Sequence, residues 1–146
     1  DEVIGLYQDN NMDYVGNTEP PTYPDGLDTE VFSFTALETA YRQAEEPFER
    51  EHVTPYLYTS KKFRLGEFKN SQDLSNLRWT VDHKVDLELI REIVRLIPSR
   101  PILMENILDL FSKYPELKKI NQGIPQNEGY MKSLKEDEEF LNSKHI

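Results

Sequence analysis

The sequence contains no cysteine, so it can form neither a disulfide framework nor a zinc site built on thiolates. It also lacks an apolar run long enough to span a membrane and a hydrophobic leader, and we therefore expect a cytoplasmic protein without a membrane partner. Positive charge is scarce, because 17 lysines and arginines stand against 27 acidic residues. Without a basic stripe, a nucleic-acid partner is not expected.

A glycine-rich loop of the kind that holds phosphates is absent from all 146 residues. Nucleotide-binding proteins of the α/β class usually carry such a loop after their first strand. The chain also begins at Asp1 directly in a helical pattern, without an initiating methionine and without a leading loop. We therefore expect it to be a piece of a longer protein, with any phosphate-binding loop upstream.

Hydrophobic periodicity and turn residues predict strands that alternate with helices, which is typical of an α/β fold. A capping-box pattern from Thr35 to Glu38 predicts that a helix begins at Thr35. A loop rich in proline is predicted over residues 18–26, because proline has no backbone N–H to donate to a helix or a sheet. The predicted strands cover residues 13–17, 27–34, 63–68 and 77–81. The predicted helices cover residues 2–10, 35–44, 47–60 with a break near Pro55, 86–97, 102–114 and 129–142.

The stretch from residue 77 to residue 97 carries the most specific chemical signal. A buried strand over residues 77–81 is predicted to end at Asp82, and a short turn and the helix 86–97 follow. Ligands of open α/β sheets bind at the carboxyl ends of strands, where an acidic side chain can hold Mg²⁺ beside phosphate oxygens. Since Asp is also a preferred N-cap residue, the alternative is that Asp82 only caps the helix.

Acidic residues gather around the turn at residues 23–30. Strand alternation predicts that Asp28 and Glu30 lie on one face, where such a pair could bind sugar hydroxyls. The alternative is a Pro-Asp-Gly turn followed by a solvated strand face.

Two further segments carry basic residues. Arg50, Glu51 and His52 are adjacent, but neighbours on a helix diverge by roughly 100°, so they would not all reach one ligand. His52 is either a binding residue or a buried, hydrogen-bonded side chain. Arg78 lies in an otherwise apolar segment and needs a partner, which is either a carboxylate of the chain or an anionic substrate.

Four segments in order resemble one known family. They are residues 23–28 (YPDGLD), 50–56 (REHVTPY), 73–88 (DLSNLRWTVDHKVDLE) and 127–134 (NEGYMKSL). Their order and spacing resemble the cytidylyltransferases of the spore-coat polysaccharide synthesis (SpsF) type, which are related to the enzymes that activate sialic acid and other sugar acids.

The resemblance implies a three-layer, nucleotidyltransferase-like α/β fold (GT-A or Rossmann-like) with a mixed sheet. This chain would contribute its C-terminal half, residues 1–98, followed by a helical C-terminal extension, residues 99–146. The implied activity is the transfer of a cytidylyl group from CTP to a sugar or sugar acid, with Mg²⁺ as cofactor and pyrophosphate as the leaving group. In the relatives an aspartate at this strand end ligates the metal, and that role falls on Asp82. The candidates for the sugar pocket are Asp25, Asp28, Glu30, Arg50, His52 and Arg78.

The chain departs from the family in two ways. Sialic-acid-type relatives have a second aspartate two residues before the metal ligand, and this chain has Thr80 there. The half of the family that binds the nucleotide is also missing, so we expect the chain alone to be inactive. The relatives commonly form dimers, and a homodimer is therefore expected for the longer protein.

Two other functions are compatible with the sequence. A glycosyltransferase of similar fold would consume a nucleotide sugar rather than make one. A non-catalytic interaction module is favoured by the hydrophobic content of 37% and by the charged segment 135–139. In the predicted last helix, Tyr130, Met131 and Leu134 have the spacing of a face that packs or contacts another subunit.

Overall fold

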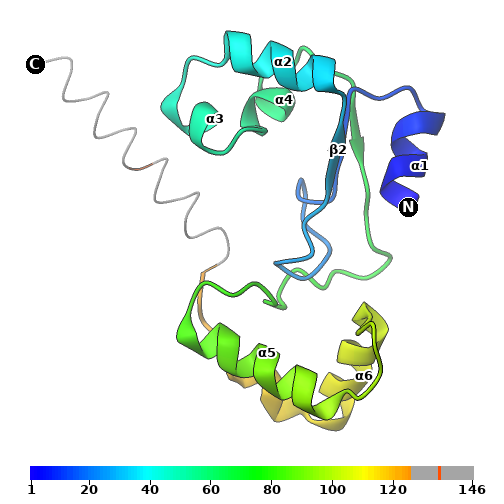
Figure 1. The fold of residues 1–146 in the computed structure, drawn as a ribbon, viewed down its shortest axis with the longest axis vertical. Helices are drawn as coiled ribbons and strands as arrows, with labels where there is room; N and C mark the ends of the chain where they lie inside the picture. The colour runs from blue at the N-terminus through cyan, green and yellow to red at the C-terminus, as the bar shows by residue number, and fades with distance from the viewer. Residues whose placement is uncertain (126–134, 136–146) are drawn as a thin grey trace, which may run out of the picture. The chain divides into compact units, whose positions relative to one another are not determined.

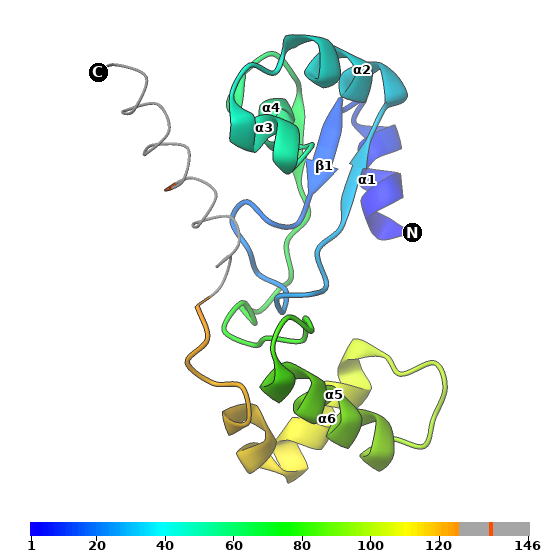
Figure 2. The same cartoon turned by 60° about the vertical axis from the view of Figure 1, so that its left-hand side comes forward.

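The computed structural model of the protein describes residues 1–125 and Lys135. Up to residue 125 the chain forms two compact units (Figures 1 and 2). Unit 1 contains residues 1–20 and 29–69, and unit 2 contains residues 21–28 and 70–125. The predicted boundary between residues 98 and 99 stays a prediction.

The predicted last helix, apart from Lys135, lies outside the described residues, as do its apolar residues Tyr130, Met131 and Leu134. Among the helices that the structure does describe, none is both long enough and apolar enough to cross a lipid bilayer.

Unit 1 is built on a small mixed sheet with the strand order β2-β1-β3. The central strand β1 (Tyr14–Gly16) pairs antiparallel with β2 (Glu30–Phe32) and parallel with β3 (Leu65–Glu67). Helix α1 (Glu2–Asp9) contacts β1 and β2. The three strands fall within predicted strands but are shorter, because regular pairing covers only three residues on each.

Three helices connect β2 to β3: α2 (Phe34–Gln43), α3 (Pro47–Glu51) and α4 (Pro55–Thr59). A proline opens α3 and another opens α4, because the first helical position has no use for a backbone N–H. The predicted break near Pro55 is thus confirmed. The buried core of this unit consists of Tyr14, Ala36, Ala40, Ala44, Tyr56 and Leu57.

The predicted cap of the helix that follows β2 was wrong by two residues. The N-cap is Ser33, whose hydroxyl oxygen accepts a hydrogen bond from the backbone N–H of Ala36 at 3.0 Å. Thr35 lies inside the first turn, and its carbonyl oxygen accepts from the hydroxyl of Thr39. Ser33 takes the cap because its backbone is extended, as an N-cap requires.

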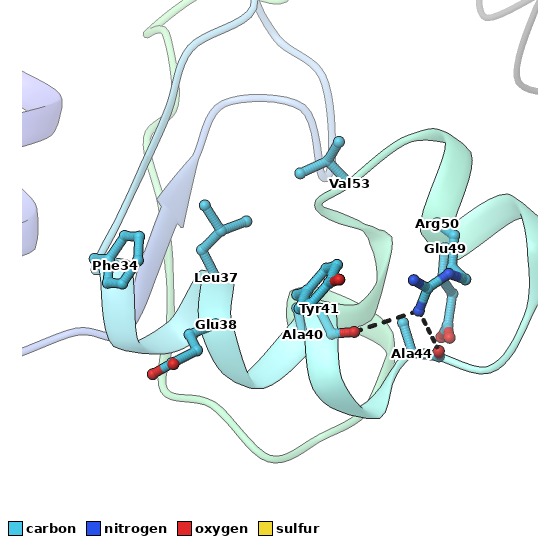
Figure 3. A pocket seen from close by; sticks show the side chains of 9 residues that line it. All are labelled: Phe34, Leu37, Glu38, Ala40, Tyr41, Ala44, Glu49, Arg50 and Val53. Atoms are coloured by element: carbon cyan, nitrogen blue, oxygen red, sulfur yellow. Dashed lines mark hydrogen bonds between the residues drawn. The ribbon is translucent and has the colours of Figure 1, made fainter.

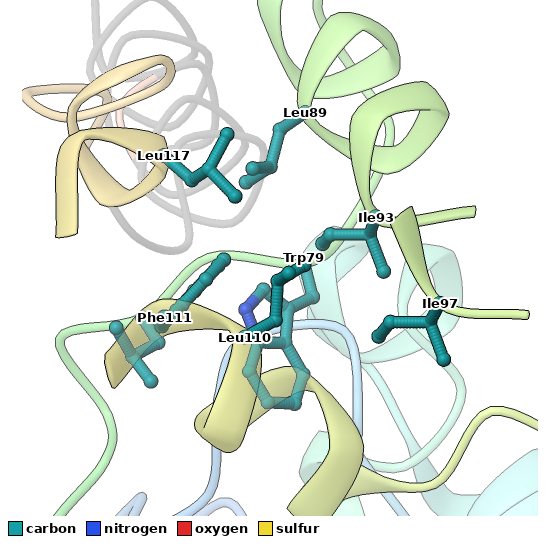
Figure 4. Close-up of a cluster of buried hydrophobic side chains, with 8 residues drawn as sticks. Trp79, Leu89, Ile93, Ile97, Leu110, Phe111 and Leu117 are labelled. Carbon is teal, nitrogen blue, oxygen red and sulfur yellow. The ribbon is translucent and has the colours of Figure 1, made fainter. Parts of the chain in front are cut away.

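Unit 2 contains helix α5 (Lys84–Leu96), helix α6 (Met104–Lys113) and the short 3₁₀ helix η1 (Pro115–Lys119). The two α-helices agree with their predictions to within two residues. The ring of Trp79 packs edge-on against Phe111, with 6.1 Å between ring centroids. Figure 4 shows the core into which these helices turn their apolar faces. It consists of Leu77, Trp79, Leu89, Ile93, Ile97, Leu110, Phe111 and Leu117.

The segment 77–81 begins buried, as predicted, but it is not a strand of the sheet. It makes a single parallel bridge, between Arg78 and Asp25. Pro24 offers no backbone N–H, and Gly26 turns the chain with a φ of 100°, so the pairing does not extend on either side of Asp25. Asp82 therefore precedes helix α5 without marking the tip of a sheet strand.

Candidate functional site

Arg78 lies at the centre of a group of acidic side chains in unit 2. Its side chain is only 8% exposed, and its guanidinium group contacts three carboxylates. Nη1 lies 3.0 Å from Asp25 Oδ2, Nη2 lies 2.8 Å from Asp82 Oδ2, and Nε lies 3.1 Å from Asp86 Oδ1. The predicted need for a charged partner is confirmed, and the partners belong to the chain itself.

Asp86 is fully buried and anchors this group. Its Oδ1 accepts hydrogen bonds from Arg78 Nε at 3.1 Å and from Asn121 Nδ2 at 2.8 Å. Its Oδ2 accepts from Arg78 Nη2 at 3.1 Å and from the backbone N–H groups of His83 at 2.9 Å and Asp82 at 3.2 Å. Both oxygens are therefore fully engaged, which is what makes a buried charge tolerable.

Burial and hydrogen bonding act on Asp86 in opposite directions. Burial raises the pKa of this carboxyl, because it penalises the charged form. The hydrogen bonds from Arg78, from Asn121 and from the two backbone N–H groups outweigh it and hold the pKa of Asp86 well below its usual range. The side chain is consequently a permanent anion at neutral pH.

Asp86 also closes the amino end of helix α5. The N-cap is His83, and its backbone N–H donates to the carboxylate of Asp86 three residues later. A negative charge in the first turn is favourable, because the helix dipole is positive there. The alternative in which Asp82 caps the helix is therefore wrong, since the N-cap is His83 and its backbone N–H is satisfied by Asp86.

Asp82 differs from Asp86 in being open to solvent, with 62% of its side chain exposed. Its Oδ2 accepts from Arg78 Nη2 at 2.8 Å and from the hydroxyl of Thr80 at 3.4 Å. Arg78 thus fixes one oxygen of an otherwise exposed carboxylate.

The described residues do not form a complete magnesium site around Asp82. No group of three or more His, Asp and Glu side chains in this part of the chain could hold a metal ion. The space among Asp25, Asp82 and Asp86 is occupied by the guanidinium group of Arg78. Mg²⁺ is usually bound through one or two carboxylates together with phosphate oxygens and water. Asp82 could supply one such ligand, but these residues do not hold the ion by themselves.

The six residues predicted for the sugar pocket are distributed over both units. The structure joins Asp25 and Arg78 in unit 2, and it places Asp28 on the surface. Glu30, Arg50 and His52 belong to unit 1. Their role in binding a sugar stays a prediction.

Arg50 is turned toward the carboxyl end of helix α2 (Figure 3). Its Nη1 donates to the carbonyl oxygens of Tyr41 at 3.3 Å and Ala44 at 3.2 Å, and its guanidinium carbon lies 5.5 Å from the centroid of the Tyr41 ring. A cation in this place satisfies the last carbonyls of a helix and complements its dipole. Arg50 also lines an apolar groove of about 470 Å³ together with Phe34 and Val53.

The other two unit 1 candidates lie in different surroundings. His52 is half-buried at the carboxyl end of α3, where its backbone N–H donates to the carbonyl of Phe48 at 3.0 Å. Glu30 accepts a 2.5 Å hydrogen bond from the hydroxyl of Tyr14. Burial and this carboxylate raise the pKa of Tyr14 far above its ordinary value, so its hydroxyl stays protonated.

Sequence reasoning missed the roles of Asp86 and Asn121. The signal for Asp86 was present, because it lies three residues after the N-cap His83, where a capping carboxylate belongs. Asn121 gave no local signal. It lies 43 residues after Arg78 in an irregular segment, and only the tertiary fold brings its amide to the carbonyl of Arg78 at 2.9 Å.

No protein-family model matches the chain. Among curated proteins it is similar to the uncharacterized protein MJ1063 of Methanocaldococcus jannaschii, with 33% identity over 142 residues. That match covers 95% of this chain and 55% of the relative.

Among solved structures the chain is similar to a cytidylyltransferase from Leptospira borgpetersenii serovar Hardjo-bovis, with a TM-score of 0.78 and 27% identity. The match covers 86% of this chain and 54% of that one. The predicted fold class, a nucleotidyltransferase-like mixed α/β fold, is confirmed. The chain spans about half the length of both relatives.

Proposed function

We propose that this chain is the C-terminal portion of a cytidylyltransferase that activates a sugar or sugar acid with CTP. The observation that supports this most is the agreement in fold with a solved cytidylyltransferase, at a TM-score of 0.78 over 86% of the chain. The proposed activity belongs to the longer protein, because the chain matches about half of that enzyme. As in the SpsF-type proteins that the motifs resemble, the product would serve surface-polysaccharide or spore-coat synthesis. A cytoplasmic homodimer is part of this proposal.

The proposed reaction is a nucleotidyl transfer. An oxygen of a sugar hydroxyl or sugar phosphate forms a bond to the α-phosphorus of CTP. The bond from that phosphorus to the bridging oxygen breaks, and pyrophosphate leaves with its electron pair. A hydroxyl nucleophile releases its proton to solvent or to a base. Transfers of this kind depend mainly on positioning and on stabilising charge.

Within this proposal Asp82 is one ligand of the Mg²⁺ that CTP carries. Its carboxylate is exposed and is fixed by a buried arginine, so it is accessible and held in place at once. The remaining ligands would be phosphate oxygens, water and residues other than those the structure describes. The network of Arg78, Asp86 and Asn121 would serve as the support that positions Asp82.

The test of the function is pyrophosphate release by the full-length protein, with CTP, ATP, GTP or UTP and a panel of sugars, sugar phosphates and sugar acids. We expect release only with CTP, only with a sugar present and only with Mg²⁺. The 146-residue chain alone should give no turnover. Absence of pyrophosphate with CTP and every sugar would refute the proposal. Consumption of a nucleotide sugar instead would identify a glycosyltransferase.

The ligand role of Asp82 is tested in the same full-length protein. Asp82→Asn should lower kcat at least about tenfold and raise the Mg²⁺ concentration needed for half-maximal rate. Glu88→Gln, an exposed change in the following helix, is the matched control and should leave both unchanged. Near-normal rates for Asp82→Asn at low Mg²⁺ would show that Asp82 is not a metal ligand and only pairs with Arg78.

A further inference from the structure

A hollow of about 340 Å³ lies beside the parallel strands β1 and β3 of unit 1. The half-buried Tyr58 and the buried Tyr14 line it, with 6.0 Å between their ring centroids and 55° between their planes. Gly16 and Gly66 also line it, and they leave these positions of the strands without side chains. Its volume lies within the range of pockets that take small molecules.

Packing explains why these two lining positions are glycine. A Cβ atom at Gly16 would lie 2.6 Å from the hydroxyl oxygen of Tyr14, and one at Gly66 would lie 2.9 Å from a methyl group of Val15. Larger residues would push the Tyr14 side chain away or disturb the buried strand β1. Glycine at both positions therefore keeps this part of the hollow free of side chains.

The charged residues among those that line the hollow are Glu19 and Glu67, both exposed acids. Lys69 lies 2.5 Å from Glu67 and offsets part of its charge. The ring of Tyr58, the Thr59 hydroxyl and the carboxylates of Glu19 and Glu67 thus share one hollow, and the charge of its lining is negative.

We propose that this hollow binds the ring of the sugar substrate, and that this sugar is neutral or carries an amino group rather than a carboxylate. The inference rests on the proposed function and narrows its substrate class. The half-buried ring of Tyr58 can pack against the C–H face of a pyranose, and the carboxylates of Glu19 and Glu67 can accept strong hydrogen bonds from its hydroxyl groups. The reacting hydroxyl or phosphate would project out of the hollow, away from the two glutamates.

Sugars with a carboxylate and sugars with an amino group should interact with the charge of the hollow in opposite ways. A sugar acid would bring its carboxylate toward Glu19 and Glu67, and juxtaposed like charges weaken binding. An ammonium group on an amino sugar would instead be attracted by the same glutamates. Glu30, which was predicted for the sugar pocket, does not line this hollow. Its carboxylate accepts from the hydroxyl of Tyr14, and its backbone pairs with Gly16.

The experiment is ligand-observed NMR on the 146-residue chain without nucleotide, with methyl glucoside, methyl glucosaminide and N-acetylneuraminate as probes. We expect the first two to bind at least about tenfold more tightly than the sugar acid. The double variant Glu19→Gln, Glu67→Gln should weaken binding of methyl glucoside about tenfold and reduce the discrimination against the acid. Both glutamates are exposed, so this variant keeps its fold.

The matched control is Glu88→Gln, Glu105→Gln, which makes the same change in charge on exposed positions of unit 2 and should alter neither affinity. Binding of N-acetylneuraminate as tight as that of methyl glucoside would overturn the inference. Failure of all three probes to bind, or indifference of binding to Glu19→Gln, Glu67→Gln, would overturn it as well.

The same measurements separate this inference from the proposed function. If the full-length protein releases pyrophosphate from CTP only with sugar acids, the function stands and the substrate class is wrong. If methyl glucoside binds in the hollow but no sugar supports pyrophosphate release, the sugar site stands and the cytidylyltransferase proposal fails.

Discussion

The two units bury polar groups in different ways. In unit 2 the buried polar centre is ionic, with Arg78 and Asp86 paired beneath the surface and Asn121 completing the hydrogen bonds. In unit 1 it is a neutral phenol, because the Tyr14 hydroxyl donates to the half-buried carboxylate of Glu30. A buried ion pair is tolerable only when its geometry is complete, whereas a phenol carries no charge to be stripped of water.

The apolar cores of the two units also differ in the side chains that they pack. Unit 2 packs large aliphatic and aromatic side chains from two helices, whereas unit 1 packs alanines and tyrosines against a narrow sheet. Unit 2 holds a buried ion pair, on which we expect its stability to depend. Unit 1 leaves space beside its sheet, and that space is the hollow to which we assign a ligand.

The largest expected effect is that of Arg78→Met, which leaves Asp86 buried without its partner. The free energy of unfolding of unit 2 should fall by about 3–5 kcal/mol. Arg95→Met is the control, because the Arg95–Glu92 pair is exposed and should contribute less than about 1 kcal/mol. Urea denaturation followed by the fluorescence of Trp79, the single tryptophan of the chain, measures both. Equal losses for the two variants would contradict an ionic centre in unit 2.

Gly26→Ala should be next in size, with a loss of about 2–3 kcal/mol. Gly26 has a φ of 100°, and a Cβ there would lie 2.6 Å from the backbone nitrogen of Thr80. Gly5→Ala is the matched control, because nothing lies within 4 Å of its Cβ position in helix α1 and alanine is the better helix former. That variant should be slightly stabilised. A neutral Gly26→Ala would mean that the turn does not rest on residues 79–80.

The free energy of unfolding should depend on pH differently in the two units, with an effect of order 2 kcal/mol in unit 2. The pKa of Asp86 is lowered in the folded state, so its contribution is complete above about pH 4 and is lost as pH falls below that value. The pKa of Tyr14 is raised, so unit 1 should keep its contribution up to about pH 10 and lose it at higher pH. NMR of both units across the pH range measures this, and acid loss in unit 1 before unit 2 would contradict it.

Tyr14→Phe should have the smallest effect, a loss of about 1 kcal/mol in unit 1. The variant removes one hydrogen bond but leaves the Glu30 carboxylate partly in water, where it can be solvated. Tyr41→Phe on the exposed face of α2 is the control and should change the stability by less than about 0.5 kcal/mol. A loss as large as that of Arg78→Met would remove the distinction between the two centres.

Local patterns were sufficient to predict the α-helices that the structure describes up to residue 125 and the approximate positions of the sheet strands. They were not sufficient for residues 77–81, whose apolar and β-branched residues have a real strand preference. Regular pairing also needs a continuous partner, and Pro24 and Gly26 limit that partner to one residue, Asp25. Capping was ambiguous for a similar reason, because Ser33 and Thr35 are both good N-cap residues and the backbone conformation decides between them.

The candidate site was predicted only in part. A charged Arg78 among apolar neighbours indicated a buried partner, since an isolated charge does not stay there. Which carboxylate would be exposed and which buried depended on the packing of α5 and of the segment that carries Asn121. The hollow of unit 1 was not predicted, because its walls come from strands and a helix far apart in the sequence.

The activity that we propose for the longer protein is the transfer of a cytidylyl group from CTP to a sugar. Phosphorus NMR of the full-length protein with CTP, Mg²⁺ and the sugar panel observes this transfer directly. The expected result is a new signal from a cytidylyl group joined to a sugar oxygen, formed together with an equal amount of free pyrophosphate. CTP that stays intact with every sugar, or that is only hydrolysed without forming a sugar adduct, would contradict the proposed transfer.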